Sequence, residues 1–209
     1  MSLPAPPLLL ITDRLSCRGK VEDVVAAALR GGCRWVMVRE KDLDHDALVA
    51  LARRIVVDAA RIGATVVVNG DAAAAVEAGA AGVHLPQGGS VAEARRVAGA
   101  GALVGVSCHS ESELRAADRD GADYATLSPV FPTESKPEYG PALGLAAFAR
   151  LVRPTRLPVL ALGGVGAANA AACRRAGAAG IAVMGGVMRA TDPERALAAM
   201  IAALDSGSR

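Results

Sequence analysis

The sequence predicts a single (β/α)8 barrel, in which one closed sheet of eight parallel strands is surrounded by helices. Three observations favour it. Short apolar runs alternate with amphipathic, alanine-rich stretches along the whole chain. Helix-capping signals lie between the runs. The composition is 52% hydrophobic but only 2% aromatic, which suits a core of small branched residues packed between strands and helices.

The strands are predicted from eight runs that are short and almost continuously apolar. A parallel strand that is covered by helices has this pattern, whereas a strand with one solvent-exposed face alternates. The runs are Leu8–Asp13, Trp35–Glu40, Thr65–Gly70, Ala81–Pro86, Leu103–His109, Tyr124–Val130, Pro158–Gly164 and Gly180–Gly186.

The helices are predicted from their start and stop signals. Ser90-x-x-Glu93 and Ser110-x-x-Glu113 match the capping box, and Asp192-Pro193 places an N-cap residue before a proline at the first helical position. Glycine-alanine pairs recur just before strands, where glycine would end the preceding helix.

Eight strand-helix units favour a closed TIM barrel over the alternative, an open doubly wound sheet. The chain has 209 residues, against about 250 in a typical barrel of this type. We therefore expect one minimal barrel domain over residues 1–209.

The composition also limits the partners. The formal net charge is +2 without a basic tract, so nucleic acid is not expected. Residues 1–7 do not resemble a signal peptide, and no run approaches the roughly 20 apolar residues that span a bilayer, so we expect a cytoplasmic protein without membrane association. The four scattered cysteines are expected to be reduced thiols, most of them buried.

Polar residues follow several predicted strands, at the end of the barrel where active sites of this fold lie. Arg39 and Lys41 follow the second strand, Asn69 ends the third, and Lys136 lies beyond the sixth. Side chains alternate along a strand, so Arg39 should point into the barrel mouth above Met37. Several cations around one mouth predict an anion-binding site.

Two glycine pairs follow the last two strands, Gly163-Gly164 and Gly185-Gly186. In these barrels the loops after strands seven and eight often bind phosphate through backbone N–H groups. The alternative is that both pairs are turns without a ligand. Their position at both expected strands favours a phosphate site.

His109 follows the fifth strand and directly precedes a predicted helix. Histidine has an unperturbed pKa of about 6.5 and is suited to proton transfer near neutrality. We expect a catalytic role for His109, with a structural role as the alternative. His84 is expected to be packed in the core and His45 to lie on the surface.

Several motifs together resemble the thiamine phosphate synthase/TenI family along nearly the whole chain. No one of them is decisive, but their order and spacing are specific. The motifs are Val38-Arg39-Glu40-Lys41, Val68-Asn69-Gly70, Gly82-Val83-His84-Leu85-Pro86-Gln87, Gly105-Val106-Ser107-Cys108-His109-Ser110, Ser128-Pro129-Val130-Phe131-Pro132-Thr133-x-Ser135-Lys136, Ala161-Leu162-Gly163-Gly164-Val165 and Gly180-Ile181-Ala182-Val183-Met184. The resemblance implies that Thr133, Ser135, Lys136 and Met184 also bind substrate.

The family contains two activities. The synthase joins hydroxymethylpyrimidine pyrophosphate to thiazole phosphate with magnesium, and the TenI-type tautomerase moves a proton on a carboxythiazole phosphate to give its aromatic isomer. In the synthase motif two aspartates hold magnesium and a glutamine helps to bind the pyrimidine, but this chain has Gly70, Gly89 and Met37 there. Asp71 is adjacent, although alternation would direct its side chain elsewhere.

These departures, together with the histidine-serine pair at His109, favour the tautomerase, although the loop at Phe131–Lys136 is closer to the synthase pattern. We therefore expect a thiazole tautomerase without metal or cofactor, whose small-molecule substrate is a thiazole phosphate and whose proton is moved by His109. The first alternative is the synthase, which would use magnesium. The second is a non-catalytic barrel that binds thiazole phosphate and has a regulatory role. A homo-oligomer is compatible with the sequence but is not predicted by it.

Overall fold

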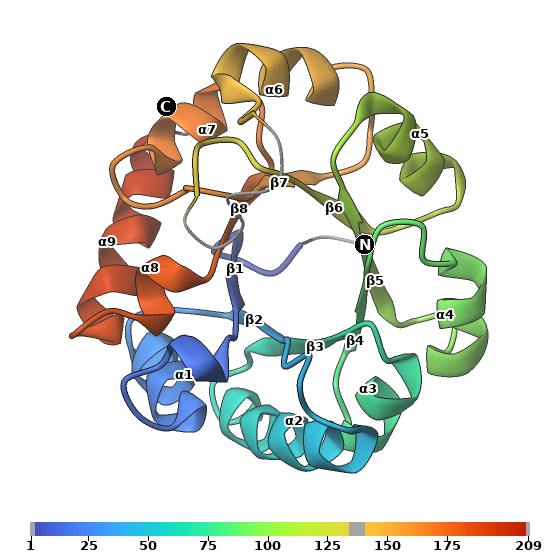
Figure 1. The fold of residues 1–209 in the computed structure, drawn as a ribbon, viewed down its shortest axis with the longest axis vertical. Helices are drawn as coiled ribbons and strands as arrows, with labels where there is room; N and C mark the ends of the chain where they lie inside the picture. The colour runs from blue at the N-terminus through green and yellow to red at the C-terminus, as the bar shows by residue number, and fades with distance from the viewer. Residues whose placement is uncertain (1–2, 134–140, 208–209) are drawn as a thin grey trace.

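Eight parallel strands close into a barrel in the computed structural model, which describes residues 3–133 and 141–207 (Figure 1). Each strand pairs with its neighbours in sequence, and β1 pairs with β8, which closes the sheet. The strands are β1 (Leu8–Ile11), β2 (Trp35–Val38), β3 (Thr65–Asn69), β4 (Gly82–Leu85), β5 (Leu103–Cys108), β6 (Tyr124–Leu127), β7 (Val159–Ala161) and β8 (Gly180–Val183). The prediction of a closed barrel rather than an open sheet is confirmed.

Helices form a ring around the barrel (Figure 1). In the described ranges they are η1 (Arg14–Ser16, a 3-10 helix), α1 (Val21–Arg30), α2 (His45–Ala60), α3 (Ala72–Ala78), α4 (Val91–Ala98), α5 (Glu111–Arg119), α6 (Gly144–Val152), α7 (Ala170–Arg175), α8 (Gly185–Met188) and α9 (Pro193–Ser206). None of the helices in these ranges has the length and apolar character needed to cross a membrane.

The predicted caps are present. The Ser90 hydroxyl accepts a hydrogen bond from the Glu93 amide at 3.2 Å, and the carboxylate of Asp192 accepts one from the Arg195 amide at 2.9 Å. Gly79 ends α3 with φ +71°, a left-handed conformation that glycine adopts without steric cost. These local signals fix where the helices begin and end.

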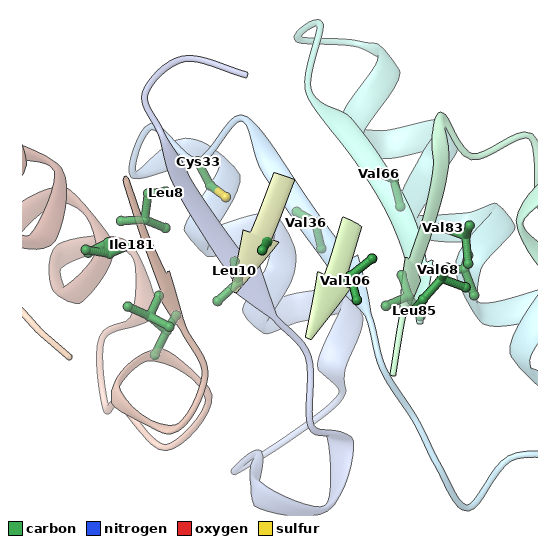
Figure 2. Close-up of a cluster of buried hydrophobic side chains, with 14 of the residues drawn as sticks. Leu8, Leu10, Cys33, Val36, Val66, Val68, Val83, Leu85, Val106 and Ile181 are labelled. Carbon is green, nitrogen blue, oxygen red and sulfur yellow. The ribbon is translucent and has the colours of Figure 1, made fainter. Parts of the chain in front are cut away.

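The strand side chains form two apolar layers. Leu8 and Leu10 point outward to the helices, whereas Leu9 and Ile11 point into the barrel, as the period of two requires. Figure 2 shows the outer layer, in which Leu8, Leu10 and Ile181 lie on the helix-facing side of the strands. Both faces of the sheet are therefore buried, which explains the continuous apolar runs.

The inside of the barrel holds two large aromatic side chains, Trp35 and Tyr124. The rings of Trp35 and Tyr124 meet edge to face, with centroids 4.6 Å apart. Gly105 makes room for Tyr124, because a Cβ atom at position 105 would lie 2.1 Å from the Tyr124 ring. At the N-terminal end of the strands, Leu3 packs against this inner layer.

The strands end one to three residues before the predicted runs end. Arg39, Gly70 and His109 therefore lie in the loops that leave the barrel, just beyond the last paired residue. This places them at the ends of the strands, where the side chains of Arg39 and His109 line the cavity. Cys33, Cys108 and Cys173 are buried and Cys17 is half-buried, all as free thiols, as expected.

Candidate active site at the barrel mouth

A cavity of about 510 Å³ opens at the C-terminal ends of the strands, a size typical of small-molecule sites. It brings together most of the site residues predicted from the sequence. Those that line it are Arg39, Asn69, His109, Thr133, Gly163, Gly164, Met184, Gly185 and Gly186. Lys41 is exposed and is not part of the lining. Ser135 and Lys136 lie outside the described residues.

Arg39 is half-buried and enters the cavity from the end of β2. Its amide donates a 2.9 Å hydrogen bond to the hydroxyl of Thr12, which ties the ends of β1 and β2 together. Met37 is buried below it and forms part of the floor. The predicted alternation of these two side chains is thus present, and it places a permanent positive charge above an apolar base.

Gly163 and Gly164 form a loop that no larger residue could adopt unchanged. Their φ angles are +90° and +63°, and a Cβ atom at Gly164 would lie 2.5 Å from the carbonyl oxygen of Pro132. No described residue accepts a hydrogen bond from either amide. Two backbone donors therefore remain for a ligand in the cavity.

The second glycine pair begins α8 and also borders the cavity. The guanidinium of Arg189 lies against it, because a Cβ atom at Gly185 would be 2.4 Å from a terminal nitrogen of that side chain. Arg189 lines the same cavity, as does Asp13, whose carboxylate accepts a 2.5 Å hydrogen bond from Ser16. The sequence interpretation missed Arg189, since the tight turn of α8 is what returns it to the mouth.

Hydrogen bonds hold both the ring and the backbone of His109. Its ring Nδ1 lies 2.8 Å from the carbonyl oxygen of Ser128, so Nδ1 carries the proton in that contact because a carbonyl only accepts. Its backbone amide donates to the carboxylate of Glu113 at 2.6 Å. In the neutral ring, the second nitrogen, Nε2, is then an acceptor.

His84 lies under the cavity as the centre of a buried hydrogen-bond chain. Its Nδ1 is 3.0 Å from the Tyr124 hydroxyl and its Nε2 is 2.9 Å from the Ser107 hydroxyl. Burial, and then the nearby Arg39 guanidinium, lower the pKa of His84 to about 3. The expectation that His84 is packed is confirmed, and the imidazole is neutral at physiological pH. Its link to Ser107, which lines the cavity, was not foreseen.

Among the described residues, the two positions that hold magnesium in the synthase motif carry no carboxylate. Gly70 and Gly89 carry no ligand atoms, and Asp71 does not line the cavity. One Asp71 oxygen caps α3 by accepting from the Ala74 amide at 2.8 Å, and the other lies 2.7 Å from Nδ1 of His45, which is on the surface as expected. Across the described ranges, no cluster of three or more histidine, cysteine, aspartate or glutamate residues could hold a metal.

Relatives of known name match almost the whole chain. The thiamine-phosphate synthase of Anaeromyxobacter dehalogenans is 44% identical over 182 residues, covering 87% of this chain and 82% of the relative. That of Roseiflexus castenholzii is 38% identical over 193 residues, covering 91% and 85%. The structure of thiamine phosphate pyrophosphorylase from Pyrococcus furiosus superposes with a TM-score of 0.86 at 26% identity, covering 96% of each chain.

These relatives overturn the prediction of a thiazole tautomerase. Proteins that are 36–44% identical to this chain are named thiamine-phosphate synthases, and the structurally similar protein is named a thiamine phosphate pyrophosphorylase. The tautomerase was inferred from three positions, Gly70, Gly89 and Met37, and from His109. Three positions near the ends of strands, of which Met37 lines the cavity, weigh less than similarity along the entire barrel. The predicted role of His109 in moving the proton of a tautomerase reaction is therefore wrong as well.

The family model described as thiamine monophosphate synthase matches residues 8–187. This range runs from the first residue of β1 into α8, and so it includes every strand and all the described cavity-lining residues except Arg189. The chain belongs to the thiamine monophosphate synthase family.

Proposed function

We propose that this chain is a thiamine-phosphate synthase that joins hydroxymethylpyrimidine pyrophosphate to thiazole phosphate. The observation that carries the proposal is the identity of 38–44% to synthases over most of the barrel. The cavity supports it, because it offers separate donors for two phosphorylated substrates.

The glycine loops are the proposed site of the thiazole phosphate. The amides of Gly163 and Gly164 are available, and no described residue accepts a hydrogen bond from those of Gly185 and Gly186. Backbone amides at glycines allow close approach of a phosphate group. Thr133 and Met184 border the same space.

Arg39 and Asn69 are the proposed contacts of the pyrimidine pyrophosphate, because they line the cavity at the ends of β2 and β3. A guanidinium can bind phosphate oxygens through two parallel hydrogen bonds. Lys41 is exposed near the same strand end and would add positive charge at the rim. Met37 supplies an apolar surface where the synthase motif has glutamine, so the pyrimidine ring would pack there rather than hydrogen-bond.

The reaction balances as a substitution. The bond between the pyrimidine methylene carbon and the pyrophosphate oxygen breaks, and that carbon bonds to the thiazole nitrogen. The electron pair of the broken bond leaves with inorganic pyrophosphate. Charge therefore builds up on the departing pyrophosphate, and Arg39 is positioned to stabilise it. The step transfers no proton from carbon. His109 is therefore proposed to line the cavity and orient the substrate rather than to act as a base.

Magnesium, which the family resemblance implies, does not fit the mouth residues within the ranges 3–133 and 141–207. Neither position of the motif carries a carboxylate, and both oxygens of Asp71 already have partners. The roles above therefore use only side chains and amides of the chain.

The test is a condensation assay with both substrates and magnesium in the buffer, followed by chromatography of thiamine phosphate. Wild-type protein should form it. Arg39→Gln should raise the KM for the pyrimidine pyrophosphate by about tenfold, because a charge-assisted hydrogen bond is lost. Arg195→Gln, an exposed arginine on α9 outside the cavity, should match wild type. Absence of thiamine phosphate with wild-type protein would refute the proposal.

A further inference from the structure

The positions where the synthase motif carries its magnesium ligands are built here for glycine. Gly70 has φ +79°, a backbone conformation that side-chain-bearing residues rarely adopt. Its amide donates a 2.9 Å hydrogen bond to the His84 carbonyl oxygen, which fixes that conformation beside the cavity floor. At Gly89, a Cβ atom would lie 2.9 Å from Cβ of Leu85. Each aspartate would therefore require a local change of the backbone or its packing.

The neighbouring carboxylate cannot take over without losing its own contacts. Burial raises the pKa of Asp71, but the Ala74 amide and then His45 outweigh burial, so the pKa lies below its usual value. The group is therefore ionised, yet it is committed to capping α3 and pairing with His45. Moving it into the mouth would break both interactions.

The charge of the lining is the opposite of that of a metal site. Among the described lining residues the carboxylate is that of Asp13, which is held by Ser16. Two arginines, Arg39 and Arg189, line the same cavity. Arg39 follows β2 and Arg189 follows β8, and β1 lies between these two strands in the barrel wall.

The placement of Arg189 depends on Gly185. The planar group lies where the side chain of any other residue at position 185 would begin. Its nitrogens are therefore held beside one of the two glycine pairs that line the cavity. Arginine is protonated at any physiological pH and offers several donors in one plane, which suits a polyanion.

We infer that the chain binds the pyrophosphate-bearing substrate without a magnesium ion held by its own carboxylates, and that Arg39 and Arg189 supply the positive charge instead. The inference rests on the proposed function for the identity of the substrate. It assigns Arg189, which lies outside the motifs of the family resemblance, to anion binding.

The first experiment measures binding with inorganic pyrophosphate and manganese as probes. Calorimetry in EDTA should detect pyrophosphate binding to the wild type, with a Kd within about threefold of that in magnesium. Arg39→Gln and Arg189→Gln should each weaken that binding about tenfold, whereas Arg195→Gln should not. Electron paramagnetic resonance should find no stoichiometric Mn²⁺ site on the protein alone.

The second experiment adds the carboxylates. Gly70→Asp/Gly89→Asp should gain Mn²⁺ binding, with circular dichroism as the check on folding. Gly70→Asp alone replaces it if the double variant does not fold, since a Cβ atom at position 70 meets nothing within 4 Å. A stoichiometric Mn²⁺ site on the wild type, or pyrophosphate binding that is lost in EDTA and restored by magnesium, would overturn the inference. So would unchanged pyrophosphate binding by both arginine variants.

These binding measurements are separate from the condensation assay. If thiamine phosphate is not formed but pyrophosphate binds through the two arginines in EDTA, the proposed function fails and the assignment of the arginines stands. If thiamine phosphate is formed but manganese binds the wild type, the proposed function stands and the inference about the metal fails.

Discussion

Nε2 of His84 lies 2.9 Å from the hydroxyl of Ser107, so a fully buried imidazole supports a hydroxyl that faces the cavity. On its other side, His84 contacts the Tyr124 hydroxyl, which belongs to the inner layer of the barrel. The floor of the site is thus connected to the centre of the core. Changes that disturb this core should also be detected at the mouth.

The neutral His84 predicts a pH dependence of stability. Its pKa is lowered from 6.5 to about 3, so the unfolded chain binds the proton more readily than the folded one. The stabilisation is fully present above pH 6.5 and is lost progressively as the pH falls toward 3. Urea denaturation over this range should show a steeper decline for the wild type than for His84→Gln, which retains hydrogen-bonding groups. Parallel curves would contradict the assignment.

Gly105→Ala should be strongly destabilising, because the new methyl group would enter the Tyr124 ring. Overpacking of a core typically costs about 1–3 kcal/mol of unfolding free energy. Gly101→Ala is the matched control, since a Cβ atom there meets nothing within 4 Å. Denaturant unfolding of the two variants measures the difference in their free energies of unfolding. Equal stability would show that the Tyr124 ring can move away without cost.

Gly164→Ala should damage the phosphate loop. The residue has φ +63°, and its Cβ atom would lie 2.5 Å from the Pro132 carbonyl oxygen. The left-handed conformation alone costs an alanine about 1–2 kcal/mol. We expect a higher KM for the thiazole phosphate and little change in that for the pyrimidine pyrophosphate, whereas Gly166→Ala, with open space around it, should behave as wild type. Equal effects on both KM values would argue against separate phosphate sites.

The fold was predictable because both faces of each strand are buried. Runs such as Leu8–Ile11 and Trp35–Val38 are apolar throughout for that reason, and Ser90 and Asp192 cap helices by local hydrogen bonds. The ends of the strands were less predictable, because residues such as Gly70 continue the pattern while their backbone leaves the sheet.

The site was predictable where a residue directly follows a strand, as Arg39 and His109 do. Arg189 was not, since it reaches the cavity through the short helix α8 rather than from the strand itself. The prediction of the reaction was wrong because Gly70, Gly89 and Met37 were taken to indicate a tautomerase rather than a synthase. Under the proposed function, Gly70 and Gly89 reflect a different way of binding the pyrophosphate, and Met37 gives the pyrimidine ring an apolar contact.

The most direct test of the account is the yield of both products from the two substrates. With wild-type protein, thiamine phosphate and inorganic pyrophosphate should appear together in equal amounts, because one pyrophosphate leaves for each bond formed. Intact substrates after prolonged incubation, or pyrophosphate released without thiamine phosphate, would contradict the assignment of this chain as a synthase.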